Sequence, residues 1–164
     1  DKNLQHSVEL YSLTKGYSMA GWRVGFAVGN PDAVAAVTKL KSYIDYGTFQ
    51  PIQIASTVAL KELDEYPFEL STVYKERREL VVEHLEDLDF IVQESNATMF
   101  VWAKLPEKFH KDSLKFSLDI LEKSNVALSP GVGFGKFGEG YIRIALVENK
   151  QRIRQAMKNI KAAL

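Results

Sequence analysis

Short stretches of alternating hydrophobic and polar residues recur along the chain, and longer stretches with helical periodicity separate them. Alternation with a period of two, in residues that favour extended backbone, predicts strands. Apolar residues spaced by three or four positions predict helices that bury one face. On these patterns the predicted strands span residues 8–13, 23–29, 90–92, 99–103, 126–128 and 141–146, and the predicted helices span residues 31–43, 51–63, 72–88, 113–123 and 149–163. Strands that alternate with helices indicate an α/β protein.

Polar capping residues mark where several of these helices begin. Asn30 precedes Pro31, which suits the first position of a helix because its missing N–H would be unpaired there anyway. Ser71 and Asn149 can cap two further helices, and Pro67 predicts an interruption before the helix that Ser71 caps. The predicted breaks and loops are residues 14–21, 46–51 and 130–140.

The predicted elements divide unevenly between two parts of the chain. Residues 1–70 hold two strands and two helices, which is too few for a sheet with its own core, whereas residues 71–164 hold enough for a compact domain. Residues 1–70 are therefore expected to be the end of a larger domain, and residues 71–164 a small α/β domain. The chain begins without a methionine, so we expect a fragment of a longer protein. In isolation, residues 1–70 should be poorly ordered or packed against a partner chain.

Composition excludes several classes of function. The 164 residues are 46% hydrophobic and 26% charged, as in soluble globular proteins, and 21 basic residues balance 21 acidic ones. That balance argues against nucleic acid or an anionic membrane as a partner. The absence of cysteine excludes disulfides and thiolate sites and fits a cytoplasmic location, and no apolar run could span a membrane. No metal site is expected, because the histidines show no metal-ligand spacing; they are His6, His84 and His110.

The strongest candidates for functional residues lie near the start of the chain. Lys15 follows a predicted strand, with the hydroxyls of Ser12 and Thr14 beside it, and Arg23 begins the next predicted strand. Arginine suits phosphate because its planar fork donates two hydrogen bonds, and a lysine near a second cation becomes a better amine nucleophile toward an aldehyde. Phosphate and aldehyde together describe pyridoxal phosphate. On these residues alone, solvated surface charges remain the favoured interpretation.

The segment from Ser12 to Gly25 resembles the lysine signature of class I/II pyridoxal-phosphate-dependent aminotransferases, and every position of it fits. The resemblance implies that Lys15 holds the cofactor as a Schiff base and moves a proton between the substrate α-carbon and the cofactor. It implies that Ser12, Thr14 and Arg23 hold the cofactor phosphate. Thr14 stands where serine is commoner, which keeps the hydroxyl.

A second segment, residues 130–145, is similar to the part of the same family that binds the substrate carboxylate. Arg143 matches the arginine that grips the α-carboxylate of the amino acid. Ile142 and Ile144 flank it, so Arg143 should lie on the opposite face of its strand. An arginine that points inward needs an anion, although a surface arginine is the ordinary alternative on a strand.

The resemblance runs from Val8 to the last residue and favours the branch of bacterial alanine–glutamate aminotransferases. It implies fold type I, with residues 1–70 as the C-terminal remnant of the large cofactor-binding domain and residues 71–164 as the small C-terminal domain. It also implies an intact homodimer that transfers an amino group between an amino acid and a 2-oxo acid by a ping-pong mechanism.

Other functions stay open beside this one. Aspartate- or diaminopimelate-type aminotransferases and other fold-type-I lyases, decarboxylases or synthases share these residues, and so does a non-catalytic aminotransferase-like binding module. No arginine lies between Arg23 and Arg77, which weakens a strict aspartate specificity. Tyr46 and its neighbours could reach a partner's site or pack within a helix break. The remaining aromatic residues, Trp22, Trp102 and the phenylalanines, are predicted to be core.

The resemblance also implies that the acidic partner of the pyridine nitrogen, the ring-stacking aromatic and a glycine-rich phosphate turn lie upstream of Lys15. We therefore expect the 164-residue chain alone to show no transaminase activity, because the cofactor would be a poor electron sink without that acidic partner. Purified chain, loaded with pyridoxal phosphate, should form no pyruvate from alanine and 2-oxoglutarate. Robust turnover would contradict the expectation.

Overall fold

The computed structural model describes residues 1–109 and 112–164, and His110 lies outside this described part. Helices and strands alternate along the chain, which confirms the predicted mixed α/β class. The chain separates into two compact units, Asp1–Leu70 and Ser71–Leu164.

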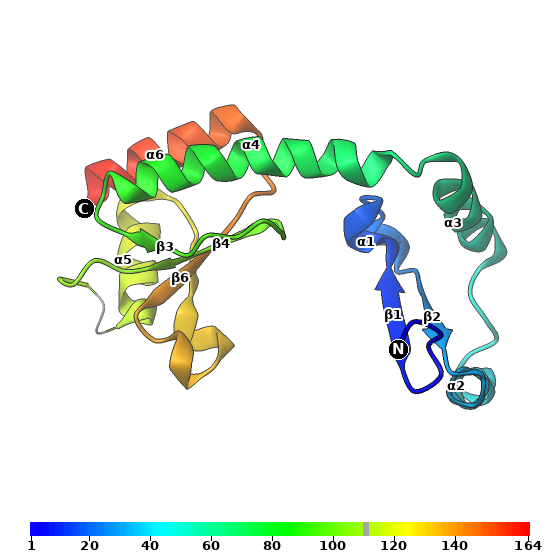
Figure 1. The fold of residues 1–164 in the computed structure, drawn as a ribbon. Coiled ribbons are helices and arrows are strands. Elements are labelled where there is room, and N and C mark those ends of the chain that lie inside the picture. The colour runs from blue at the N-terminus through cyan, green and yellow to red at the C-terminus, as the bar shows by residue number, and fades with distance from the viewer. Residues whose placement is uncertain (110–111) are drawn as a thin grey trace. The chain divides into compact units, whose positions relative to one another are not determined.

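The first unit contains a two-stranded ribbon and two long helices. Strand β1 pairs antiparallel with β2, and the short helix α1 follows β1 directly (Figure 1). The side chain of Asn30 accepts a hydrogen bond from the Ala33 N–H and caps α2, as the sequence predicts. The elements are β1 (Val8–Ser12), α1 (Leu13–Gly16), the 3₁₀ turn η1 (Ala20–Trp22), β2 (Gly25–Gly29), α2 (Pro31–Ile44), α3 (Gln50–Glu62) and the first turn of α4 (Tyr66–Glu86).

A small apolar cluster holds this unit together. Leu13, Met19 and Ala59 are buried in it, and Tyr17 packs against them. Most other large apolar side chains of the unit are exposed, Trp22 among them, so the prediction that Trp22 is core was wrong. Apolar periodicity predicts which face of an element will be buried, but the first unit supplies too few elements to cover those faces.

The second unit is built on a four-stranded antiparallel sheet in the order β3-β4-β6-β5. The predicted cap of the last helix is confirmed, because the Asn149 side chain accepts from the Arg152 N–H at 3.0 Å. The elements are the rest of α4, β3 (Ile91–Val92), β4 (Phe100–Lys104), α5 (Ser113–Ser124), β5 (Ser129–Pro130), the 3₁₀ turns η2 (Gly131–Phe134) and η3 (Lys136–Gly138), β6 (Tyr141–Ala145) and α6 (Lys150–Ala163).

The helices of the second unit pack on one face of its sheet. Val101, Ala103 and Ile142 are buried on that face, in one cluster with Leu85 of α4 and Met157 of α6. An ion pair between Lys150 of α6 and Glu76 of α4 also joins these two helices, both labelled in Figure 1. Because successive strand residues point to opposite faces, alternate residues of β4 and β6 emerge on the other face. That second face carries Arg143.

Several predicted boundaries were wrong, each for a local reason. Residues 14–21 are not simply a loop, because α1 and η1 form single turns there, and Arg23 precedes β2 instead of belonging to it. The strand predicted at 126–128 lies at Ser129–Pro130. Helix α4 begins at Tyr66 and includes Pro67, because the first turn of a helix tolerates a residue without an N–H. Of the phenylalanines predicted as core, Phe90 and Phe116 are buried, whereas most others are not.

The core of the second unit generates a stability prediction. Leu85 is 0% exposed, so Leu85→Ala should lower the free energy of unfolding by about 2–5 kcal/mol, through lost transfer energy and a cavity. Leu118→Ala on α5, where the side chain is 56% exposed, is the matched control and should change it by about 0.5 kcal/mol or less. Urea denaturation followed by circular dichroism measures both. Equal effects would contradict the assigned core.

Candidate active site

Lys15 stands on a single helical turn at the end of strand β1. Ser12 ends the strand and caps this turn, because its Oγ accepts a hydrogen bond from the Thr14 N–H at 3.3 Å. Lys15 is exposed and Thr14 half-buried. The sequence prediction of a strand-end lysine beside two hydroxyls is therefore right about position, while the backbone is helical where a loop was expected.

Leu13 fixes this turn to the neighbouring strand segment. Its side chain is fully buried, and its N–H donates to the Val24 carbonyl at 3.3 Å. Its own carbonyl accepts from the N–H groups of Tyr17 at 3.1 Å and Met19 at 3.3 Å. Leu13, two residues before Lys15, is thus fixed by hydrogen bonds to its N–H and its carbonyl and by burial of its side chain.

Tyr66 provides a further contact that the sequence did not indicate. Its hydroxyl donates to Ser18 Oγ at 3.1 Å, and its ring stacks on that of Tyr17 with centroids 6.4 Å apart. The Lys15 turn is thereby tied to the start of α4 within the first unit. No sequence signal joins these residues, because they are separated by about fifty positions.

Arg23 lies close to the same end of the ribbon. Ser12 pairs with Gly25 across β1 and β2, which places Arg23 two residues before the partner of Ser12. Its backbone is left-handed, with φ 51° and ψ 50°, and its Nη1 donates to the Ala20 carbonyl at 3.1 Å. The guanidinium is exposed and has no carboxylate partner among the described residues. Its remaining N–H groups are therefore available to an anion.

These donors match the chemistry of pyridoxal phosphate. Two hydroxyls and a guanidinium can all donate to phosphate oxygens, and the Ser12 hydroxyl hydrogen is not used by its capping bond, in which the oxygen accepts. A primary amine on a fixed turn can react with an aldehyde. Ser12, Thr14, Lys15 and Arg23 all belong to the first unit.

Arg143 belongs to the second unit, on the sheet face away from the helices. Strand β6 pairs it with Trp102 of β4 and Ser129 of β5. Its Cζ lies 4.1 Å from the ring centroid of Phe100 and 4.3 Å from that of Phe134. Its Nε is buried and has no hydrogen-bond partner among the described residues. The predicted placement between inward-facing Ile142 and Ile144 is confirmed, whereas the sequence did not reveal the two phenylalanines around Arg143.

The turns before β6 are fixed from both ends. A side chain on Gly131 would collide with the backbone of Gly138, and one on Gly138 with that of Gly131, so the two approach directly. The Ser113 hydroxyl accepts from the Val132 N–H at 3.2 Å. The carboxylate of Glu139 accepts from the N–H groups of Ser113 at 2.6 Å and Gly140 at 2.8 Å. Phe134 therefore projects from a braced segment.

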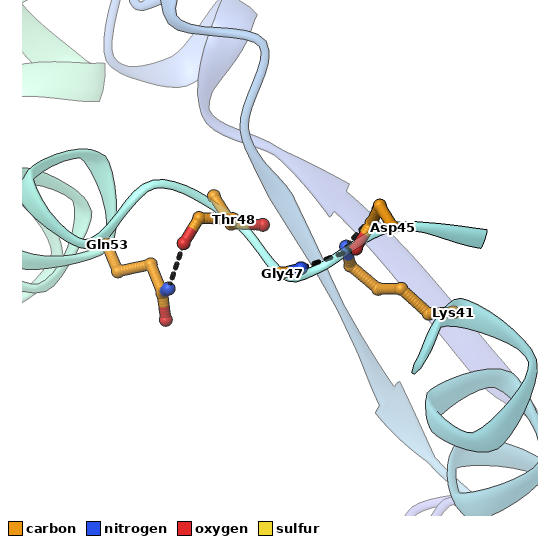
Figure 2. A network of polar contacts seen from close by, with 5 residues as sticks. All are labelled: Lys41, Asp45, Gly47, Thr48 and Gln53. Carbon is orange, nitrogen blue, oxygen red and sulfur yellow. Dashed lines mark hydrogen bonds and ion pairs between the residues drawn. The ribbon is translucent and has the colours of Figure 1, made fainter. Parts of the chain in front are cut away.

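The connection between α2 and α3 is organised by one carboxylate. Figure 2 shows Asp45 accepting from Lys41 Nζ at 2.6 and 2.8 Å and from the Gly47 N–H at 2.8 Å. Farther along the connection, Gln53 Nε2 donates to the Thr48 carbonyl. The hydrogen bond from Lys41, followed by that from Gly47, holds the pKa of Asp45 below its usual value. Tyr46, between these contacts, is fully exposed, so of the two alternatives left open by the sequence, packing within the helix break is not what the described residues show.

Comparison with known proteins decides the family. The profile described as "Aminotransferase class I and II" matches residues 2–160. The chain belongs to the class I and II aminotransferases. The family expected from the lysine segment is thus confirmed.

Individual relatives agree with this family. The chain is 52% identical over 159 residues to "Putative aminotransferase AatC" of Rhizobium meliloti (strain 1021), covering 96% of this chain and 39% of the relative. It is 45% identical to the glutamate-pyruvate aminotransferase AlaC of Escherichia coli (strain K12), covering 95% and 38%. It is 47% identical to an LL-diaminopimelate aminotransferase of Natranaerobius thermophilus, covering 94% and 39%. The chain therefore spans about two fifths of the length of these relatives.

A solved structure confirms the fold. The structure named as a probable N-succinyldiaminopimelate aminotransferase from Thermus thermophilus superposes with a TM-score of 0.90 at 37% identity, covering 100% of this chain and 44% of that one. The likeness to the glutamate–pyruvate branch is present, as expected, and the diaminopimelate branch matches at a similar level. In the described part of the chain, no helix is long and apolar enough to cross a membrane, and no three or more His, Cys, Asp or Glu side chains come together where they could hold a metal ion.

The hydrogen bonds to the Glu139 carboxylate lead to a prediction about stability and pH. Hydrogen bonds from Ser113 first, and then from Gly140, lower the pKa of Glu139. A carboxyl with a lowered folded-state pKa stabilises the fold above its unfolded pKa of about 4.3, and this contribution disappears as pH falls through the lower folded value. Glu139→Gln should therefore be less stable than wild type at pH 7, and the difference should shrink below about pH 4. Denaturation between these pH values measures it; a difference independent of pH would contradict the assignment.

Proposed function

We propose that the complete polypeptide containing this chain transfers an amino group between an amino acid and a 2-oxo acid with pyridoxal phosphate as cofactor. The single observation that carries the proposal is the exposed Lys15 amine on a fixed turn, with two hydroxyls and Arg23 close to it in the fold. Membership of the aminotransferase family supports the reaction class, and the donor set supports the cofactor.

Each residue has a distinct role in this proposal. Ser12, Thr14 and Arg23 hold the cofactor phosphate, because hydroxyl and guanidinium donors suit its oxygens. Lys15 would hold the cofactor aldehyde through its Nζ, and the same amine would move a proton between the substrate α-carbon and cofactor C4′. Arg143 binds the substrate α-carboxylate. The bound cofactor supplies an electron sink for the charge that this proton transfer leaves.

We infer an alanine- or glutamate-like amino donor as the leading substrate. The likeness to AlaC of Escherichia coli supports this choice. The absence of arginine between Arg23 and Arg77 favours alanine, because a side-chain carboxylate would favour a second arginine, and glutamate would be accepted through other contacts. The LL-diaminopimelate aminotransferase among the relatives supports diaminopimelate as the alternative donor. Steady-state kcat/KM values for alanine, glutamate and diaminopimelate would rank these substrates.

The proposal also includes a homodimer, in which the connection between α2 and α3 contacts the second subunit. Asp45 stiffens this connection through Lys41 and Gly47, while Tyr46 and Phe49 are exposed on it. Exposed aromatic side chains on a fixed turn are typical of protein interfaces. Analytical ultracentrifugation of the complete polypeptide tests this part, and a monomer at micromolar concentration would contradict it.

Loss of Lys15 tests the reaction most directly. Lys15→Ala in the complete polypeptide should lower kcat for alanine and 2-oxoglutarate by at least roughly 10²–10⁴-fold, the usual share of proton transfer alone. Lys39→Ala, on the exposed surface of α2, is the matched control and should keep wild-type kcat. Pyruvate formation measures both. A Lys15→Ala variant with wild-type kcat would contradict the proposal.

Loss of Arg23 tests the phosphate contact separately. A hydrogen bond to a charged group contributes about 1.5–3 kcal/mol, so Arg23→Ala should raise the Kd for pyridoxal phosphate by roughly 10- to 100-fold. Arg23→Lys should fall between wild type and alanine, because it keeps the charge and loses the fork. Cofactor absorbance during dialysis measures the Kd, and unchanged affinity in both variants would remove Arg23 from the phosphate site.

A further inference from the structure

Two aromatic rings lie close to the Arg143 guanidinium. The Phe100 centroid lies 4.1 Å from Cζ, and the Phe134 centroid lies 4.3 Å from it. Both distances are well within the range of about 6 Å at which a cation is attracted to the face of a ring. The contacts come from separate elements, because Phe100 is on β4 and Phe134 on the turn η2.

This arrangement restricts how Arg143 can bind an anion. All donor hydrogens of a guanidinium lie in its plane, so an anion must approach along one of its edges. One edge carries Nε, which is buried and has no hydrogen-bond partner among the described residues. An unsatisfied buried donor is costly, and a carboxylate lying in the guanidinium plane would satisfy it with two parallel hydrogen bonds.

We propose that Phe134, together with Phe100, is a positioning residue that fixes the plane of Arg143 for edge-on binding of a carboxylate through Nε and one Nη. The proposal rests on the carboxylate-binding role given to Arg143 above and names residues that act through it. Phe134 itself need not touch the carboxylate. Its effect is to restrict the guanidinium of Arg143 before the carboxylate binds, so that less conformational entropy is lost on binding.

Phe134 is held for this role by contacts outside the main core. Its ring meets Trp102 edge-to-face, with centroids 5.5 Å apart and planes at 82°. Trp102 is in turn stacked on Tyr141 at 5.5 Å. Phe100 and Phe134 together form an aromatic clamp on Arg143. Phe134 is still 51% exposed, so truncating it removes one ring of this clamp and opens no cavity among the buried core residues.

The matched control is Phe137 on the next turn. Phe137 is 88% exposed and its ring contacts Lys136, with Nζ 5.0 Å from the centroid. It therefore offers the same chemistry, a cation beside an exposed phenylalanine, without contact to Arg143. Phe137→Ala and Phe134→Ala remove the same atoms from the same segment.

The experiment is an acetate titration of the 164-residue chain, followed through the ¹⁵N NMR signal of Arg143 Nε–H. All residues of the clamp lie in Ser71–Leu164, so the chain contains them. Phe134→Ala should weaken acetate binding at Arg143 about three- to tenfold and lower the order parameter of its Nε–H. Phe134→Tyr, which keeps the ring face, and Phe137→Ala should behave as wild type. Phe134→Leu keeps apolar bulk and should resemble alanine, which separates the ring face from simple packing.

The outcomes separate the clamp from the carboxylate role. Acetate affinity that is equal in wild type, Phe134→Ala and Phe134→Leu would overturn the clamp and leave Arg143 as a carboxylate ligand. The absence of any acetate response at Arg143 in wild type would overturn the clamp and the proposed carboxylate role together. Affinity lost in Phe134→Ala and Phe134→Leu but kept in Phe134→Tyr would support the clamp. Dispersed amide spectra confirm that each variant is folded.

Discussion

Burial of Leu13 is the constraint on which the Lys15 site depends. A lysine that reacts with a ligand must be within reach of it, and its backbone has to be fixed. The chain meets both needs by placing a fully buried leucine two residues before an exposed lysine. The two backbone groups of Leu13 bind Val24, Tyr17 and Met19, so the turn cannot shift without breaking several hydrogen bonds at once.

In the second unit, a strand fixes the position of a charged side chain in a similar way. Ile142 and Ile144 join the core, and alternation sends Arg143 between them to the opposite face, where it is held by aromatic rings. A charged group thus gains a defined position from apolar neighbours in sequence, without an ion pair that would compete with a ligand. Among the described residues, no carboxylate pairs with Arg23 or with Arg143. Both arginines therefore keep donors for an anion.

The sequence predicted the features that repeat or that match a family, and it failed where a single tertiary contact decides. The α/β class, most strands and the Asn30 and Asn149 caps follow from periodicity and capping chemistry. The turn carrying Lys15 is one helical turn long, too short to produce periodicity. The position of Phe134 beside Arg143 depends on Gly131 meeting Gly138, which no local pattern encodes. Tyr46 is fully exposed, although its apolar ring would favour burial, because the described residues of the first unit supply nothing to cover it.

The central claim is that Lys15 is the lysine that bonds to the cofactor aldehyde. Reduction of the complete polypeptide with borohydride after incubation with pyridoxal phosphate would make that bond permanent, and mass spectrometry of the digested protein would locate it. Lys15 should carry the pyridoxyl group at near-stoichiometric yield, with little on the other lysines. A label concentrated on a different lysine, with Lys15 unmodified, would contradict it.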